Sequence, residues 1–295
     1  MFSHINMEDL WKEKLENIFY TFISICEKNN LRYYCSAGTA LGAVRHHGII
    51  PWDDDIDVAM PRPDYNRFIE IMKTAPSFPY KIITPETNKS YYLPYAKLYD
   101  TRTSLLEVIQ FKCVIGINID IFPLDGTSIV PMEAERLYNK YNKYFSIFKS
   151  ATAHHPFKEW VIMLYNFKIR TFLRTAFICI FKPYARKITL NYMRKIENKY
   201  NYDTSDMVIN YVEYYGFAKG YFPKTWFGKG TKTIFGSKEA IIPNQYDKYL
   251  RRIYGNYMKF PPSSERISHH SCMYVNLNKR ESLSDILRKI KESHE

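Results

Sequence analysis

The sequence predicts an α+β fold, in which a small mixed sheet packs against helices and carries a helical insertion. The first observation is the apolar spacing over residues 8–29, which is typical of an amphipathic helix. The second is the mostly helical character of residues 131–202. The third is a set of strand-like or extended segments between them, near 80–84, 92–99, 104–111 and 115–122.

The segment after the first helix predicts alternating strands and helices. Gly38 allows a sharp turn, and Thr39 is a candidate N-cap for the helix that follows. Asp64 is a candidate N-cap for a later helix. In order, we expect a strand at 32–36, a helix at 39–47, a strand at 55–60 and a helix at 63–74.

The second half of the chain predicts helices and few clear strands. The helical stretch is broken at His155-Pro156 and Lys182-Pro183, because proline removes a backbone donor. A further helix is expected at 243–254, ending near Gly255. We therefore expect a catalytic core at 1–128, a helical basic insertion at 129–215, and a C-terminal segment at 216–295 that packs back on the core.

Composition is that of a globular protein with 295 residues and a formal charge of +12. The five cysteines are scattered and form no C-x-x-C pair, which favours free thiols in a reducing compartment. The first nine residues hold no apolar core of a signal peptide. We expect a cytoplasmic bacterial protein, and no nucleic-acid motif accompanies the positive charge.

The run WDDDID at 52–57 is the most informative motif. In a strand, Asp55 and Asp57 would lie on the same face, since side chains alternate. Two carboxylates so near each other repel unless a cation lies between them. Mg²⁺ is commonly held by one or two carboxylates together with substrate phosphates. The run predicts a metal platform for phosphate chemistry, although taken alone it is also typical of a solvated acidic turn.

A small-residue turn precedes the acidic run at Gly38-Thr39. A turn between a strand and a helix start can bind an anion, because free backbone N–H groups and the helix dipole point at one place. The Gly-Lys-Ser/Thr ending of a P-loop is absent, so an ordinary strand–helix connection remains the alternative.

A third acidic position, Asp120, interrupts an apolar and β-branched segment at 117–122. A carboxylate in such a strand is costly to bury unless it is paired or binds metal. The alternative is an edge strand with Asp120 facing water.

These three motifs occur in the order typical of the nucleotidyltransferase, or polymerase-beta-like, superfamily. The longer string GTALGAVRHHGIIPWDDDIDV at 38–58, followed by IDIFPLDG at 119–126, closely resembles the LicD family. Fukutin and fukutin-related protein look like distant relatives. The resemblance covers roughly residues 8–128 and 220–272.

The resemblance implies a nucleotidyltransferase fold and a transferase that moves a phosphoalcohol, above all phosphocholine, from a CDP-activated donor. The acceptor would be a sugar hydroxyl of a cell-surface glycan or lipid-linked glycan, such as lipopolysaccharide, capsule or teichoic acid, and CMP would leave. Two alternatives remain open: a nucleotidyltransferase that releases pyrophosphate, and a transferase of phosphoribitol or phosphoglycerol.

Roles for individual residues follow from the motifs and the reaction. Asp55 and Asp57 are expected to hold Mg²⁺ or Mn²⁺, and Asp120 either completes the metal site or accepts the proton of the incoming hydroxyl. Phosphate oxygens are expected to contact four further positions: Gly38, Thr39, Arg45 and Lys97.

Phosphocholine would call for an aromatic cage around its quaternary ammonium, whereas an alditol would call for polar contacts. With 26 tyrosines in the chain, the presence of aromatic residues does not discriminate between the two. The candidates are Trp52, Tyr91, Tyr92, Tyr95 and Trp226.

Residues 158–199 carry ten cations and two acids around an apolar stretch at 160–181. The three cations inside that stretch make it a poor transmembrane span. On a helical wheel its apolar positions, including Ile169, Leu173 and Ile180, share one face. Such a helix can lie in an anionic membrane interface, which would place the protein peripherally at the inner face of the membrane, or its apolar face can pack on the catalytic domain.

Overall fold

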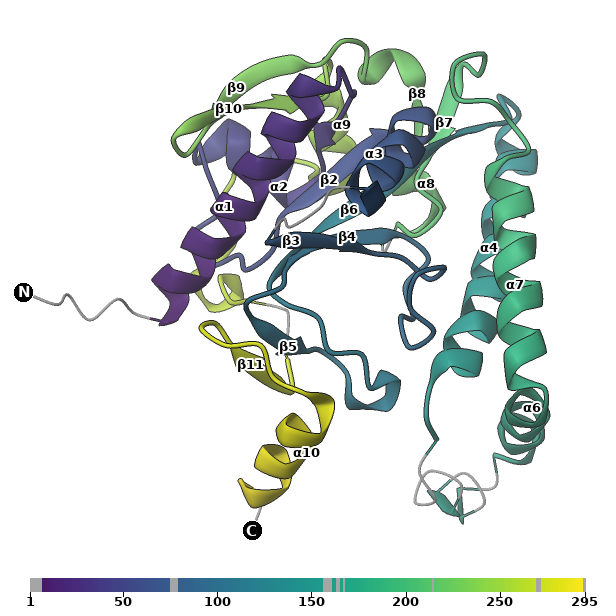
Figure 1. Cartoon of the computed structure of the whole chain (residues 1–295). Coiled ribbons are helices and arrows are strands. Elements are labelled where there is room, and N and C mark those ends of the chain that lie inside the picture. The colour runs from purple at the N-terminus through teal and green to yellow at the C-terminus, as the bar shows by residue number, and fades with distance from the viewer. Residues whose placement is uncertain are drawn as a thin grey trace, which may run out of the picture.

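The computed structural model describes residues 7–74, 79–155, 161–162, 165–166, 168–213, 215–268 and 272–293. Within them the α+β class is confirmed, with a mixed sheet at the centre of the molecule (Figure 1). The parts of the predicted helical stretch at 156–160, 163–164 and 167 lie outside the described residues.

The main sheet has the strand order β1-β2-β6-β4-β3. β2 and β6 are parallel, whereas the neighbouring pairs β1/β2, β4/β6 and β3/β4 are antiparallel, so the sheet is mixed as expected. These strands are β1 (Tyr34–Cys35), β2 (Asp57–Pro61), β3 (Tyr80–Ile83), β4 (Ala96–Asp100) and β6 (Asn118–Thr127).

β6 organises this sheet because it uses different neighbours along its length. Its first residues pair with β4 and β2, and its last three pair with β7. A hairpin of β7 (Met207–Ile209) and β8 (Tyr221–Pro223) thereby continues the sheet. No strand was expected for this hairpin: β7 lies in the predicted helical insertion at 129–215, and β8 lies in the predicted C-terminal segment at 216–295.

Helices cover the sheet and extend beyond it. Apolar side chains of α1, among them Ile18, Phe19 and Phe22, are fully buried in the same core as Val58 and Ile121 of the sheet. Figure 1 shows α4 and α7 side by side along one edge of the molecule, with α6 at their lower end. The helices are α1 (Met7–Lys28), α2 (Ala37–Arg45), α3 (Arg62–Thr74), α4 (Pro131–Thr152), α6 (Ile169–Ile180), α7 (Lys182–Glu197), α8 (Phe217–Gly220), α9 (Tyr246–Tyr254) and α10 (Leu283–Glu292).

The C-terminal segments return to the first half of the chain. β11 (Tyr274–Asn276) pairs with β5 (Ser104–Leu106), and a hairpin of β9 (Thr231–Phe235) and β10 (Lys238–Ile242) packs against β1 and α2. The predicted helix before Gly255 is confirmed as α9, and Gly255 has the positive φ of 66° expected after a helix end.

Two predicted helix caps are wrong. α2 begins at Ala37, so Thr39 lies inside its first turn, and its hydroxyl accepts a hydrogen bond from the backbone N–H of Asp57 at 2.7 Å. α3 begins at Arg62, and the Asp64 carboxylate pairs with Arg32 at 2.6 Å instead of capping the helix. In both cases the polar side chain forms its hydrogen bond or ion pair with a residue distant in sequence, and it does not cap the helix.

The acidic strand also begins later than predicted. β2 starts at Asp57, and Asp55 stands in the connection before it. The carbonyl of Asp54 accepts a hydrogen bond from the indole of Trp11 at 2.8 Å. This contact joins the acidic run to α1.

Candidate active site

A cavity of about 1080 Å³ opens beside the start of β2 and the middle of the sheet. Its wall combines the N-terminal part of α1, the acidic run, β4, the first residues of β6 and the segment around Arg266. Three of the residues predicted for the site line it: Asp55, Lys97 and Asp120.

Asp57 and Asp120 are directly paired across the parallel strands β2 and β6. Side chains of paired residues on neighbouring strands lie on the same face of the sheet. The pKa of Asp57 is well above its usual range because burial disfavours its charge, and Asp55, Asp120 and Asp53 add like-charge repulsion. The structure therefore brings the predicted acids together at one end of the sheet.

Asp120 is held by two donors of the protein itself. Its Oδ1 lies 3.1 Å from the ammonium of Lys97, and its Oδ2 accepts a hydrogen bond from the Tyr95 hydroxyl at 2.9 Å. Burial raises the pKa of Asp120 from its usual value, and the charge of Lys97 opposes that shift. The predicted alternative of a water-facing edge position is wrong, because β6 is a central strand.

Lys97 joins Asp120 to a further carboxylate that sequence reasoning missed. Its ammonium donates to Glu107 at 2.7 Å, and Glu107 also accepts a hydrogen bond from the Tyr92 hydroxyl at 2.9 Å. The Lys97 side chain is only 8% exposed, and although burial works against its charge, Asp120 and Glu107 hold its pKa above the usual range. Lys97 is thus a buried cation between two acids, not a lysine at the edge of a strand.

Gly38 and Thr39 lie in the first turn of α2, close to the acidic run. A methyl group added to Gly38 would stand 2.8 Å from Oδ2 of Asp53, so the carboxylate of Asp53 lies against the start of this helix. Neither Gly38 nor Thr39 lines the cavity. Their contact with phosphate stays a prediction.

Arg45 lies at the other end of α2, in a cluster of rings and cations. Its guanidinium donates to the carbonyl of Tyr257 at 2.7 Å and stands 4.6 Å from the ring centre of Phe260. Arg45 does not line the cavity, but Trp52 and Arg266 of the same cluster do. The structure therefore does not bring Arg45 together with the acids, and Arg266 is a cavity cation that the sequence analysis did not single out.

Of the five aromatic residues considered for a cage around a quaternary ammonium, only some line the cavity. Trp52, Tyr92 and Tyr95 line the cavity, whereas Tyr91 and Trp226 do not. Because Tyr92 and Tyr95 donate their hydroxyl groups to Glu107 and Asp120, both rings are fixed in position. No spacing in the sequence indicates these hydrogen bonds.

The acids fit a divalent cation only in part. Among the described residues, no three His, Cys, Asp or Glu side chains converge as a metal-ligand set. The ammonium of Lys97 lies 3.1 Å from Oδ1 of Asp120 and would repel a second cation there, which weighs against Asp120 as a third ligand. Asp55 and Asp57 remain a pair of crowded carboxylates, and oxygen ligands of this kind suit Mg²⁺ or Mn²⁺ when substrate phosphates complete the shell.

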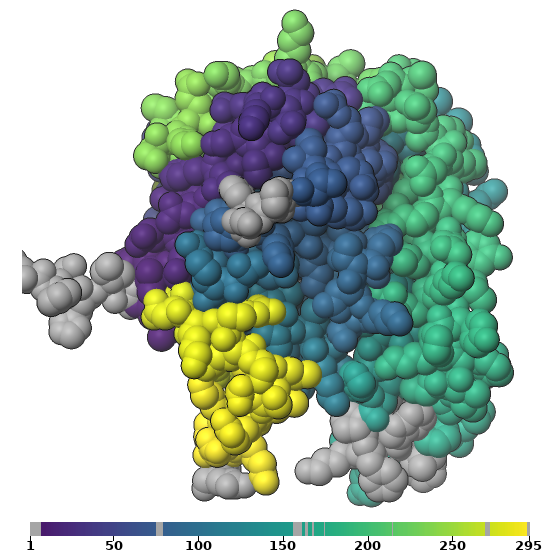
Figure 2. Space-filling model, in the orientation of Figure 1, coloured from purple at the N-terminus to yellow at the C-terminus, as the bar shows by residue number. Residues whose placement is uncertain are grey.

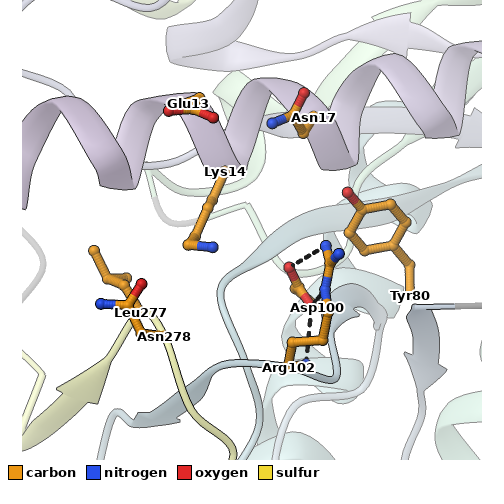
Figure 3. Close-up of a pocket in the computed structure, with 8 residues that line it drawn as sticks. All are labelled: Glu13, Lys14, Asn17, Tyr80, Asp100, Arg102, Leu277 and Asn278. Carbon is orange, nitrogen blue, oxygen red and sulfur yellow. Dashed lines mark hydrogen bonds and ion pairs between the residues drawn. The ribbon is translucent and has the colours of Figure 1, made fainter. Parts of the chain in front are cut away.

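A second, smaller cavity of about 320 Å³ lies between α1 and the end of β4 (Figure 3). Its charged groups include Asp100 and Arg102, which pair at 2.8 Å, as the dashed lines in Figure 3 show. None of the predicted site residues lines it. The larger cavity is therefore the candidate active site.

Comparison with known proteins gives one family. Residues 30–169 match the family described as LicD/FKTN/FKRP, nucleotidyltransferase domain. The chain is 29% identical over 256 residues to the lipopolysaccharide cholinephosphotransferase LicD of Haemophilus influenzae, covering 86% of this chain and 92% of that protein. It is also 42% identical over 66 residues to the uncharacterized protein RT0683 of Rickettsia typhi, covering 22% of this chain and 20% of that protein.

Proposed function

We propose that the protein transfers a phosphoalcohol, phosphocholine above all, to a sugar hydroxyl of a cell-surface glycan, because residues 30–169 match the family described as LicD/FKTN/FKRP, nucleotidyltransferase domain. The donor would be CDP-activated, and CMP would leave. The observation that carries the proposal is the cavity in which Asp55, Lys97 and Asp120 meet beside Asp57. The similarity to a lipopolysaccharide cholinephosphotransferase supports both the transferred group and the acceptor.

We propose a nucleotidyltransferase fold for residues 1–128, with 129–215 as an insertion and 216–295 as a segment that packs back on this core. The parallel pair β2/β6 supports this fold, because it places one acid of each strand side by side. The contact of β11 with β5 supports the role of the last segment.

Asp55 and Asp57 would hold Mg²⁺ or Mn²⁺ in this proposal. When bound there, the ion would neutralise charge on the diphosphate of the donor. The like-charge crowding around Asp57 supports this assignment, because a cation would relieve it.

Asp120 would accept the proton of the attacking hydroxyl. Lys97 and Tyr95 fix its orientation, and a carboxylate keeps lone pairs for a further donor after accepting two hydrogen bonds. Its raised pKa brings the group nearer to neutral pH, which suits a general base. We assign Asp120 this role ahead of that of third metal ligand.

Two groups of residues would bind phosphate oxygens: Lys97 in the cavity wall, and the start of α2 at Gly38 and Thr39. Lys97 lies in the cavity wall and can contact the donor directly, while backbone groups at Gly38 and Thr39 stand at a helix start that favours anions. Arg45 remains a proposed phosphate contact. Arg266 lines the cavity and is better placed for that task in this structure.

A panel of CDP-choline, CDP-ribitol and CDP-glycerol with a glycan acceptor tests the proposal. We expect CMP release with one donor in Mg²⁺, and loss of at least a hundredfold in Asp57→Asn. Asp203→Asn is the matched control, because Asp203 lies outside the cavity wall and is more than half exposed. Pyrophosphate release from a nucleoside triphosphate would favour the nucleotidyltransferase alternative, and CMP release at the wild-type rate by Asp57→Asn would contradict the assignment of the site.

A further inference from the structure

The apolar face of α6 and the start of α7 is exposed. Large side chains follow one another at helical spacing, with Leu173 61%, Phe177 64% and Ile180 74% exposed on α6. Tyr184 and Ile188 continue the row on α7 at 70% and 50%. We call these five residues the α6–α7 apolar row.

The opposite face of α6 already has a partner. Thr175 and Ile178 are buried, and α6 contacts α4 and α7. The expected alternative, in which the apolar face packs on the protein, is therefore wrong for Ile169, Leu173 and Ile180, which are exposed. The helix is held in place by one side while it presents Leu173, Phe177 and Ile180 outward.

The surroundings of the row are positively charged. Between residues 161 and 196 the sequence has eight lysines and arginines and no acid. Lys168, Arg170 and Lys187 are exposed near the row. An apolar row with cations beside it is complementary to an anionic bilayer, whose surface attracts the charges and whose acyl chains take up the apolar groups.

The position of the row in the molecule suits a flat partner. Figure 1 shows α6 at the lower end of the α4/α7 pair, away from β9 and β10, and in Figure 2 the same part of the chain lies at the lower right margin of the surface. Among the described residues no helix combines the length and the apolar character needed to cross a bilayer. Contact would therefore be peripheral.

We propose that the α6–α7 apolar row docks the protein on anionic lipid bilayers, with the row at the boundary between headgroups and acyl chains. Peripheral docking of this kind does not depend on the transfer reaction. It would hold the protein close to acceptors that are carried by lipids.

Vesicle flotation of the full chain tests the proposal. We expect binding to vesicles of phosphatidylcholine with about one third phosphatidylglycerol, and weak binding to phosphatidylcholine alone. The triple variant Leu173→Ser/Phe177→Ser/Ile180→Ser should lower the partition coefficient by about tenfold for each side chain. Lys168→Gln/Lys187→Gln should lower it by about fivefold for each charge and only on the anionic vesicles.

The matched control is Ile129→Ser/Ile234→Ser/Met258→Ser, which removes exposed apolar side chains away from the row. It should bind vesicles like the wild type. Circular dichroism melting and CMP release with a soluble acceptor should stay unchanged in all variants, so a failure of docking is distinguishable from a failure of the proposed function.

Two results would overturn the proposal. The first is vesicle binding by the triple variant at the wild-type level. The second is a wild-type protein that does not bind vesicles but sediments as a dimer, together with a triple variant that sediments as a monomer. The row would then bind a second copy of this chain.

Discussion

At the scale of residues, the site is defined by neighbouring carboxylates that repel one another electrostatically. Asp57 stands beside Asp120 in register, and Asp55 and Asp53 add negative charge from the preceding loop. Lys97 compensates part of this charge, but it is already shared with Glu107. We expect this arrangement to lower the free energy of unfolding in the absence of a cation, because the carboxylates repel one another.

We predict that Asp57→Asn makes the protein more stable while it abolishes transfer. The folded-state pKa of Asp57 is above its ordinary value of 3.8, so the folded state binds this proton more tightly than the unfolded state. The penalty is therefore absent below pH 3.8 and grows as the pH rises toward the folded-state pKa. We therefore expect the variant to have a higher free energy of unfolding than the wild type at pH 7.

Urea unfolding in EDTA at pH 7 and at the lowest pH where the protein stays folded measures this gain. The difference between variant and wild type should shrink at the lower pH, and Mg²⁺ should stabilise the wild type more than the variant. A variant less stable than the wild type at pH 7 would show that Asp57 is stabilised in the folded protein and that the crowding argument fails.

At the scale of elements, a buried ion-pair network joins α3, β6 and α7. The guanidinium of Arg62 donates to both oxygens of Asp125 at 2.6 and 2.8 Å and lies 3.3 Å from Glu197. The Asp125 and Glu197 side chains are each 1% exposed. This network fixes the α4/α7 pair to the central strand.

Arg62→Met should destabilise the protein by about 3–5 kcal/mol, because it leaves two buried carboxylates with too little positive charge. Denaturant unfolding measures the loss. Arg251→Met is the control, since its pair with Asp247 is exposed to solvent and should contribute much less than the buried network. Equal effects of the two substitutions would mean that the buried network adds no more than a surface pair.

The elements also show what the sequence could predict. The strong patterns of α1, β2 and β6, and the glycine after α9, fixed the class of fold and the neighbourhood of the acids. The β7/β8 hairpin could not be predicted, because its strands have three residues each and β7 pairs with β6, which lies far away in the sequence. Lys97 was found as a candidate, but its partner Glu107 was not, because only tertiary packing brings β4 and the segment after β5 together.

At the scale of the whole molecule, the cavity depends on contacts between segments far apart in sequence. The indole of Trp11 donates to the carbonyl of Asp54, and the hydroxyl of Ser268 donates to its carboxylate. The first helix and a segment near residue 268 thus hold the acidic run from both sides. Neither contact could be read from the motif itself.

Trp11→Phe should lower kcat/KM by about tenfold, because loss of the hydrogen bond lets the acidic run shift relative to Asp120. The cost in stability should be small, about 1 kcal/mol, since an aromatic ring still fills the site. Steady-state kinetics and urea unfolding measure the two effects, with Trp226→Phe as the control outside the cavity wall. Unchanged kinetics in Trp11→Phe would show that this contact does not position the acids.

We propose that the cavity directs a sugar hydroxyl to the phosphorus next to the alcohol of a CDP-activated donor. Phosphorus NMR of a reaction with CDP-choline and glycan acceptor tests it most directly, because it identifies which phosphorus is attacked. We predict CMP together with a phosphocholine diester on the glycan, and neither product in Asp57→Asn. Free phosphocholine together with a cytidylyl-modified acceptor would show that the other phosphorus is attacked, against this proposal.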